Sequence, residues 1–325
     1  MNISIIGAGA WGTAVALSSF RAGHNLTLIT KCQQDAEEIN ADHENVTFFP
    51  GIKIPQEITV THLYDSIKTA DVLFLICPSA AIEDVCTHID GLPESTPIIS
   101  FCKGLPVNYW KLPSMYISEH FPKNNFGVIS GPSYAREVAL GFPTRLVLAS
   151  KDYCCKNLPI SFSNMSIIYS DDVIGVELGG CLKNIYAIGA GIFDGLKLGE
   201  NSKCSYLTAC IHEMISIGSA LGAHADSFFG PSGIGDLLAT CTGPWSRNRT
   251  FGESITQDYN PQKLFNQSVA AIEGYRSAKT FHNIFEEKAI KAPIVDAIYE
   301  ILYTNNCQNT ADMKAKLLAS VFDQK

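Results

Sequence analysis

The strongest constraint on the fold is a glycine pattern that begins at the seventh residue. An apolar run covers residues 3–6, and residues 7–12 follow at once with the letters G-A-G-A-W-G. In a G-x-G-x-x-G pattern between a strand and a helix, Gly7 permits the tight turn, Gly9 lets a phosphate approach the backbone, and Gly12 lets the helix pack on its strand. The helix N-terminus then offers amide donors to a pyrophosphate group. The alternative is a plain glycine-rich turn.

Short apolar runs alternate with amphipathic stretches through the first half of the chain. The runs are rich in Val, Ile, Leu and Phe, and Gly, Pro, Asp or Lys bound them, as is typical of buried strands. We expect strands over residues 3–6, 26–29, 72–76, 98–101, 126–129, 145–149 and 166–169, and helices over residues 11–21, 34–41, 80–89 and 134–140. This alternation predicts an α/β domain with a doubly wound, mainly parallel sheet of the Rossmann type, covered on both faces.

The pattern changes near Asp172. Residues 173–198 and 206–222 are long, apolar and rich in Ala and Gly, and no convincing strand pattern follows them. A chain of 325 residues is long enough for two domains of ordinary size. We therefore expect a Rossmann dinucleotide-binding domain over residues 1–172 and an all-α substrate domain over residues 173–325.

Composition excludes several classes of protein and partner. With 46% hydrophobic and 17% charged residues, the chain has no bias toward disorder, collagen or coiled coil. Twenty-four Lys and Arg against 32 Asp and Glu give a net charge of -8, and no basic run is present. We therefore expect the chain neither to bind nucleic acid nor to insert stably into a membrane. The net charge does not exclude a small anionic ligand, because the binding of such a ligand depends on local charge.

The N-terminus and the cysteines favour a cytoplasmic protein. No basic segment followed by an apolar stretch opens the chain, and no apolar run reaches the roughly 18–20 residues needed to span a bilayer. The 11 cysteines are odd in number, scattered, and without a C-x-x-C pair. Free thiols in a reducing compartment fit them better than a secreted disulfide scaffold. The eight histidines form no zinc-binding helix pattern, and we expect no metal.

One charge interrupts the apolar segment over residues 178–193. Lys183 must either extend to the surface or point into a polar cleft, where desolvation would lower its pKa and suit it to proton transfer. Asn184 beside it is either a hydrogen-bonding partner or a helix-surface residue. Asp236 and Thr240 are four residues apart and would share one helix face, although Asp236 alone could be a simple helix cap.

Three further groups are candidates for binding anions. Residues 245–249 combine two guanidinium groups with hydroxyl and amide donors, which suits a phosphate monoester, although a surface basic patch would look alike. Lys103 and Ser133 each follow an expected strand, at the edge where open α/β sheets bind ligands, and Ser133 could cap a helix there. Lys31 follows the second strand, where NAD sites usually carry an acid. It could pair with the 2′-phosphate of NADP or remain solvated.

Seven blocks of sequence, in order along essentially the whole chain, resemble bacterial-type NAD(P)-dependent glycerol-3-phosphate dehydrogenase. The blocks cover residues 7–14, 103–104, 130–137, 179–184, 235–237, 246–249 and 273–276. The resemblance implies reversible reduction of dihydroxyacetone phosphate to sn-glycerol 3-phosphate with NADH or NADPH, a step that feeds glycerophospholipid synthesis. It also implies a Rossmann domain before a helical domain, and a homodimer.

The resemblance implies a role for each matching position. Lys183 matches the proton donor and acceptor, and Lys103 and Asp236 match further catalytic residues. The substrate-binding positions are Lys103, Gly131, Ser133, Lys183, Asn184, Asp236, Thr240, Ser246, Arg247 and Asn248. The cofactor-binding positions are Gly7, Gly9, Ala10, Trp11, Gly12, Lys31, Lys103, Ala135, Arg247, Ala271 and Glu273. Departures are conservative: Ala10 replaces a serine found in some relatives, and Ala271-Ile272 replaces two valines.

Two other functions remain open. A dehydrogenase of similar architecture that acts on a β-hydroxy acid or a ketopantoate-like substrate would prefer a carboxylate to a phosphate. A non-catalytic NADP-binding sensor would bind the dinucleotide without turnover. Lys183, Asp236 and Arg247 count against the sensor, because a sensor has no need of them.

Overall fold

The computed structural model describes residues 1–106, 111–268, 272–304, 307 and 309–323, and the chain divides into two compact units. The first unit comprises Met1–Cys102 and Lys111–Val173. The second comprises Ile174–Lys325 together with the stretch that begins at Lys103. Lys103 therefore packs with the helical unit, whereas the sequence analysis expected it in residues 1–172. Hydrogen bonds from its side chain and to its backbone, described below, account for the difference.

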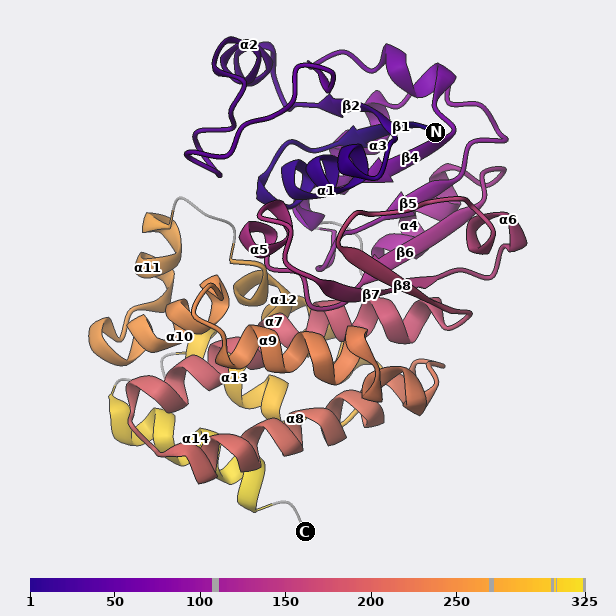
Figure 1. Ribbon diagram of the computed structural model, residues 1–325. Helices are drawn as coiled ribbons and strands as arrows, with labels where there is room; N and C mark the ends of the chain where they lie inside the picture. Colours follow the sequence, from indigo (N-terminus) through magenta and orange to yellow (C-terminus); the bar gives the residue numbers. More distant parts are fainter. Residues whose placement is uncertain (107–110, 269–271, 305–306, 308, 324–325) are drawn as a thin grey trace. The chain divides into compact units, whose positions relative to one another are not determined.

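The first unit is built on one sheet, which Figure 1 shows in indigo to magenta. Within the described residues its strands are β1 (Asn2–Ile6), β2 (Asn25–Ile29), β3 (Thr59–Thr61), β4 (Val72–Leu75), β5 (Ile98–Ser100), β6 (Phe126–Ser130), β7 (Thr144–Ala149) and β8 (Met165–Ser170). They lie in the order β3-β2-β1-β4-β5-β6-β7-β8. Neighbours pair in parallel except β6 and β7, which are antiparallel. The expected doubly wound, mainly parallel sheet is confirmed.

The helices of the first unit include two that the sequence pattern did not predict. They are α1 (Ala10–Arg21), α2 (Gln33–Asp42), α3 (Ile82–His88), α4 (Pro113–His120), α5 (Ala135–Ala139) and α6 (Tyr153–Lys156), with short 3-10 turns at Asp65–Thr69 and Ser79–Ala81. The unpredicted helices are α4 and α6, and β3 was also not predicted. Each of these elements has three to eight residues, too few for a period to be recognised.

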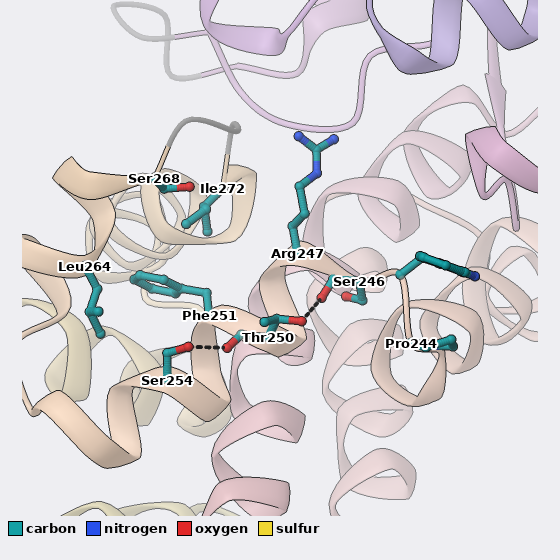
Figure 2. Close-up of a pocket in the computed structure, with 10 residues that line it drawn as sticks. Pro244, Ser246, Arg247, Thr250, Phe251, Ser254, Leu264, Ser268 and Ile272 are labelled. Atoms are coloured by element: carbon teal, nitrogen blue, oxygen red, sulfur yellow. Dashed lines mark hydrogen bonds between the residues drawn. The ribbon is translucent and has the colours of Figure 1, made fainter. Parts of the chain in front are cut away.

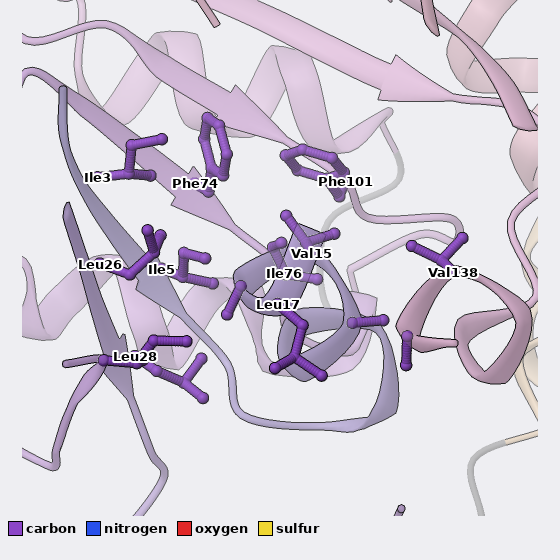
Figure 3. Close-up of a cluster of buried hydrophobic side chains, with 14 of the residues drawn as sticks. Ile3, Ile5, Val15, Leu17, Leu26, Leu28, Phe74, Ile76, Phe101 and Val138 are labelled. Atoms are coloured by element: carbon purple, nitrogen blue, oxygen red, sulfur yellow. The ribbon is translucent and has the colours of Figure 1, made fainter. Parts of the chain in front are cut away.

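Alternate residues of the strands form the core that Figure 3 shows. Ile5 and Phe74 point to the face on which α1 packs, where they meet Val15 in one buried cluster. Leu73 and Leu75 point to the opposite face and are equally buried, with 0% exposure. Because both faces are covered, the strands read as nearly continuous apolar runs.

The glycines of the first turn meet different surroundings. Gly7 has a φ of 115°, and a Cβ atom there would lie 2.3 Å from the Ile76 carbonyl oxygen. A Cβ on Gly12 would lie 1.8 Å from the Gly7 carbonyl oxygen, so α1 packs directly on the turn. A Cβ on Gly9 would meet no atom within 4 Å. Gly7 and Gly12 are therefore required by the fold, whereas Gly9 leaves open space before the N-terminus of α1.

The second unit is helical, and within the described residues it contains no strand. Its helices are α7 (Val173–Gly195), α8 (Glu200–Ala220), α9 (Asp236–Thr242), α10 (Arg247–Asp258), α11 (Pro261–Gln267), α12 (Glu273–Glu287), α13 (Pro293–Tyr303) and α14 (Thr310–Phe322), with a 3-10 turn, η3 (Ala225–Phe229), and a π-helical turn, η4 (Pro231–Gly235). This confirms the expected all-α domain. Helix α8 begins six residues before the expected position, because its first turn is polar.

Helix α7 is the core helix of the second unit. It spans 23 residues and has a mean hydropathy of 1.2, so by length and composition it could cross a membrane. The expectation that no stretch would pass such a test was wrong, because it counted only uninterrupted apolar runs. Within the apolar window of α7, 89% of the residues are buried inside the protein, as is typical of a core helix.

We expect Gly12→Ala to destabilise the protein by about 3 kcal/mol or more, because the new Cβ would overlap a backbone oxygen that cannot move aside. Gly9→Ala is the matched control. Gly9 has a φ of -72°, which alanine adopts freely, and it faces open space, so a change within about 1 kcal/mol is expected. Urea unfolding of both variants measures the difference. Equal losses would contradict the assignment of Gly12 to packing.

Candidate active site

Two lysines share one buried carboxylate in the second unit. Asp236 is the first residue of α9, Lys183 projects from α7, and Lys103 comes from the short stretch before residue 107. Asp236 Oδ2 accepts a hydrogen bond from Lys103 Nζ at 2.8 Å, and Oδ1 accepts one from Lys183 Nζ. Asp236 is 1% exposed and Lys183 is 7% exposed. The structure therefore brings together the three residues that the resemblance implied to be catalytic.

Burial lowers the pKa of Lys183 to about 8. Desolvation is the largest cause, and the positive charge of Lys103 acts in the same direction. The Asp236 carboxylate opposes both and keeps the ammonium form populated at neutral pH. A lysine balanced in this way can give up or take back a proton near neutrality, as a general acid or base must.

A glycine on α7 permits the close approach of the turn that leads into α9. A Cβ atom on Gly179 would lie 2.4 Å from the Ser232 carbonyl oxygen, which belongs to the π-helical turn η4. Gly179 stands one helical turn before Lys183, and η4 ends directly before Asp236. The absence of a side chain at 179 thus lets Lys183 and Asp236 come within hydrogen-bonding distance.

Asn184 and Asn248 link four segments of the second unit through their amide groups. Asn184 Nδ2 donates to the Lys103 carbonyl oxygen at 3.0 Å and to that of Gly180 at 3.3 Å. Its Oδ1 accepts from Asn248 Nδ2 at 2.9 Å, and Asn248 Oδ1 accepts from Gly274 N at 3.0 Å. Both Nδ2 hydrogens of Asn184 are used, whereas Asn248 keeps one. Asn184 therefore positions its neighbours, and Asn248 can still donate to a ligand.

Thr240 and Ser246 hold local backbone in this structure. Thr240 Oγ1 donates to the Asp236 carbonyl oxygen at 2.6 Å. The two residues therefore share a helix turn, but this contact uses the Asp236 backbone and not its carboxylate. Ser246 is the N-cap of α10, and its Oγ accepts from Arg249 N at 3.2 Å. Each hydroxyl is thus engaged in fixing the segment that carries it.

The two arginines at the start of α10 have different environments. Arg249 Nη1 pairs with Asp194 Oδ2 at 2.6 Å, and Lys203 Nζ contacts Asp194 Oδ1 at 2.7 Å. Arg247 is exposed, and Figure 2 shows it extending from the N-terminus of α10. Arg247 is the better placed of the two to meet a phosphate. Sequence reasoning missed Asp194, although an acid at the end of an apolar helix needs a partner.

A pocket of about 390 Å³ lies beside Arg247 in the same unit. Its lining residues are Pro244, Trp245, Ser246, Arg247, Thr250, Phe251, Ser254, Leu264, Ser268 and Ile272 (Figure 2). Phe251, Leu264 and Ile272 give it an apolar part, and a guanidinium and several hydroxyls stand at its margin. This volume suits a small molecule with one anionic group.

The glycine-rich turn of the first unit fits a dinucleotide pyrophosphate. Gly9 is the N-cap of α1 and has no side chain to occupy the amides of the first turn, which Ala10 and Trp11 contribute. Trp11 Nε1 is buried and finds no hydrogen-bond partner within the described residues. Asn45, which sequence reasoning missed, donates from Nδ2 to the Ala8 carbonyl oxygen at 2.9 Å and fixes the turn. Free amides at a helix N-terminus are the usual site for phosphate.

The remaining candidate residues occupy element ends. Lys31 is exposed and follows β2, and Gly131 follows β6 with a φ of 138°. Ser133 Oγ donates to the Gly131 carbonyl oxygen at 2.9 Å, and the N-cap of α5 is Tyr134. The expectation that Ser133 caps a helix was therefore wrong, because a local turn uses its hydroxyl. Ala135 begins α5, Glu273 begins α12, and Ala271 lies outside the described residues.

Comparison with known proteins identifies the family. The model of the NAD-dependent glycerol-3-phosphate dehydrogenase N-terminus matches residues 2–155, and that of the C-terminus matches residues 172–311. This chain belongs to the NAD-dependent glycerol-3-phosphate dehydrogenase family. It is 37% identical over 308 residues to an NAD(P)+ glycerol-3-phosphate dehydrogenase from Nitrosomonas eutropha, covering 93% of each chain. A protein of the same name from Clostridium tetani is 35% identical, over 93% of this chain and 88% of its own.

Solved structures agree with this family assignment. Glycerol-3-phosphate dehydrogenase from Coxiella burnetii is 32% identical, covers 97% of both chains and superposes with a TM-score of 0.90. A ketopantoate reductase from Ralstonia eutropha is 12% identical, covers 98% of this chain and 99% of its own, and has a TM-score of 0.57. The latter shares the fold only. The resemblance drawn from the sequence blocks is confirmed.

We expect Asp236→Ala to cost about 3–5 kcal/mol of stability at pH 7, because two ammonium groups would lose their common carboxylate. The loss should shrink as the pH rises. The folded pKa of Lys183, about 8, lies below its unfolded value, so stability already rises with pH above about 8. Without Asp236 the pKa of Lys183 falls further. The rise of stability with pH therefore begins at a lower pH in Asp236→Ala and is larger.

Urea unfolding of the wild type and of Asp236→Ala at pH 7 and pH 9.5 tests this prediction. The double variant Asp236→Ala with Lys103→Met removes one of the two ammonium groups that lost the carboxylate, and it should recover part of the lost stability. A loss that is independent of pH and unrelieved by Lys103→Met would contradict the electrostatic explanation.

Proposed function

We propose that this chain catalyses the reversible reduction of dihydroxyacetone phosphate to sn-glycerol 3-phosphate with NADH or NADPH, and that Lys183 transfers the proton. The observation that carries the proposal is the buried cluster of Lys183, Asp236 and Lys103 in a chain whose two halves match the family models. Relatives at 35–37% identity are named for this dehydrogenase with NAD(P)+.

Reduction of the ketone requires a proton at the ketone oxygen. NAD(P)H, when bound, supplies a hydride to the ketone carbon. As negative charge develops on the ketone oxygen, the Lys183 ammonium donates a proton to it. Asp236 keeps Lys183 charged before transfer and holds the neutral amine in place afterwards. In the reverse direction the neutral amine of Lys183 accepts the proton of the alcohol.

Other residues of the second unit hold the substrate. Lys103 orients the ketone and hydroxyl oxygens, and the Asn184 amide fixes the Lys103 backbone. Arg247 binds the phosphate dianion, assisted by the remaining Nδ2 hydrogen of Asn248. Binding the phosphate at a distance from the reacting carbon restricts the ketone to a reactive orientation.

The cellular setting is part of the proposal. A cytoplasmic homodimer that feeds glycerophospholipid synthesis, without nucleic-acid or membrane partners, accords with the resemblance of the sequence blocks and with the net charge of -8. Lys31, exposed after β2, would pair with the 2′-phosphate of NADP and so favour NADPH.

The first experiment follows nicotinamide absorbance with purified protein and dihydroxyacetone phosphate, using NADPH and NADH in parallel. We expect turnover with both, and Lys31→Glu should lower kcat/KM for NADPH at least about tenfold, while NADH changes little, because only NADPH has the 2′-phosphate. Lys31→Gln, without charge reversal, should give an intermediate loss.

Two outcomes would contradict these assignments. An unchanged NADPH-to-NADH ratio in Lys31→Glu would remove Lys31 from cofactor selection. Dinucleotide binding without turnover would contradict the substrate assignment. Turnover of 2-keto acids in place of the phosphate ester would favour the ketopantoate-like alternative.

We expect the two directions of the reaction to depend oppositely on pH. The reductive kcat/KM requires the Lys183 ammonium and should fall as the pH rises through about 8. The oxidative kcat/KM requires the neutral amine and should rise through the same range. Lys183→Ala should lower turnover at least about 100-fold and abolish both pH trends, and Lys291→Ala, at an exposed lysine of the same unit, is the control. Parallel trends in the two directions would rule out Lys183 as the titrating group.

A further inference from the structure

The carboxyl-terminal edge of the sheet places two cysteines at equivalent positions. In the parallel pair β4 and β5, Leu75 lies opposite Ser100. The ladder continues past both strands, since Phe101 N donates to the Leu75 carbonyl oxygen at 2.9 Å. Cys77 and Cys102 each come two residues after this pair, just past the ends of the two strands.

The spacing of the pair suits a disulfide. Neighbouring strands lie about 4.8 Å apart, within the Cα separation of about 4.4–6.8 Å that a disulfide spans. The two residues are in contact, since Cys102 Sγ lies 3.3 Å from the Cys77 carbonyl oxygen. A disulfide between them would therefore require only a local movement at Cys77.

The two thiols differ in access, although all 11 cysteines of the chain are free thiols. Cys102 is buried, with 4% exposure, whereas Cys77 is half-buried. Cys77 is thus the more exposed of the two, and Cys102 beside it can complete an exchange that begins there. Cys86, on α3, is also buried and has no register partner on a strand.

Cys77 borders the glycine-rich turn. The Cβ position of Gly7 lies 2.3 Å from the Ile76 carbonyl oxygen and 3.2 Å from Cys77 N. The strand order reverses between β1 and β4, and doubly wound sheets bind ligands in the crevice at that point. A dinucleotide held by the turn would therefore cover Cys77.

We propose that Cys77 and Cys102 are a disulfide-forming pair that reacts with low-molecular-mass disulfides such as oxidised glutathione, and that a bound dinucleotide shields it. Cys77 Sγ, as thiolate, attacks one sulfur of the disulfide and releases one glutathione thiol. Cys102 Sγ then attacks Cys77 Sγ and releases the second glutathione. Two electrons and two protons pass from the protein dithiol to the two glutathione molecules. The shielding rests on the proposed dinucleotide site, and the disulfide does not.

The surroundings of Cys77 set the rate of the exchange. Its hydrogen bond with Cys102 and its burial raise the pKa of the Cys77 thiol well above the usual value. Only a small thiolate fraction exists at pH 7, so the exchange should be slow there and about tenfold faster for each unit of pH up to pH 9. The pair would therefore respond to sustained oxidation.

The test uses the full chain with three exposed cysteines replaced, Cys32→Ser, Cys154→Ser and Cys204→Ser, so that they do not compete for the reagent. After incubation with oxidised glutathione at pH 8.5, we expect a peptide cross-link between Cys77 and Cys102 by non-reducing mass spectrometry, reversible by dithiothreitol. Adding Cys102→Ser should leave a mixed disulfide on Cys77, and adding Cys77→Ser should leave Cys102 unmodified. Cys86→Ser, the matched control, should not alter the cross-link.

Saturating NADPH should slow cross-linking at least about tenfold by covering Cys77, with its binding followed separately by tryptophan fluorescence. No Cys77–Cys102 cross-link in the folded protein, or a cross-link to Cys86, would overturn the pair. An unchanged rate with NADPH bound would overturn the shielding. A failure of NADPH to bind would overturn both the shielding and the proposed dinucleotide site, and the cross-link experiment would still decide the disulfide.

Discussion

The second unit depends on one carboxylate that has almost no contact with water. An isolated charge at 1% exposure would be too costly to keep, so Asp236 requires its two lysines, and the buried Lys183 requires Asp236. This need explains why α7, a long helix that is almost wholly buried, carries a lysine at all. It also explains why Lys103 packs with the helices although the sheet strand β5 ends only three residues before it.

The same balance that keeps the cluster folded sets the pKa of Lys183. Complete burial without a partner would leave Lys183 neutral, and a fully compensated pair would keep it charged at every relevant pH. One carboxylate divided between two ammonium groups gives an intermediate result, a pKa of about 8. The amides of Asn184 and Asn248 maintain this arrangement, because they tie the Lys103 backbone to the starts of α10 and α12. The stability of the cluster and the pKa of Lys183 therefore rest on the same contacts.

The sequence was most informative about features that depend on short-range patterns of residues. Periodicity and the first glycines predicted the sheet and the helical second half, and composition singled out Lys183. It could not assign Asp236 as the partner of Lys183, because the two are 53 residues apart and no local period connects them. The prediction that Ser133 caps a helix was wrong, since Ser133 is bonded to its own turn, and no sequence pattern singled out Asn45, whose side chain fixes the glycine-rich turn. Contacts that close long loops leave no regular trace in sequence.

Cys102 is the last residue of its segment of the first unit, and Lys103, which pairs with Asp236, follows it directly in the chain. Both neighbours of Cys102 are held: Phe101 N bonds to the Leu75 carbonyl oxygen, and the Lys103 carbonyl oxygen accepts from Asn184. Cys102 therefore has little freedom to move toward another thiol. Cys77 is half-buried and followed by Pro78, outside the sheet ladder. Any adjustment needed to join the two sulfurs would therefore fall on Cys77, whose backbone nitrogen borders the glycine-rich turn.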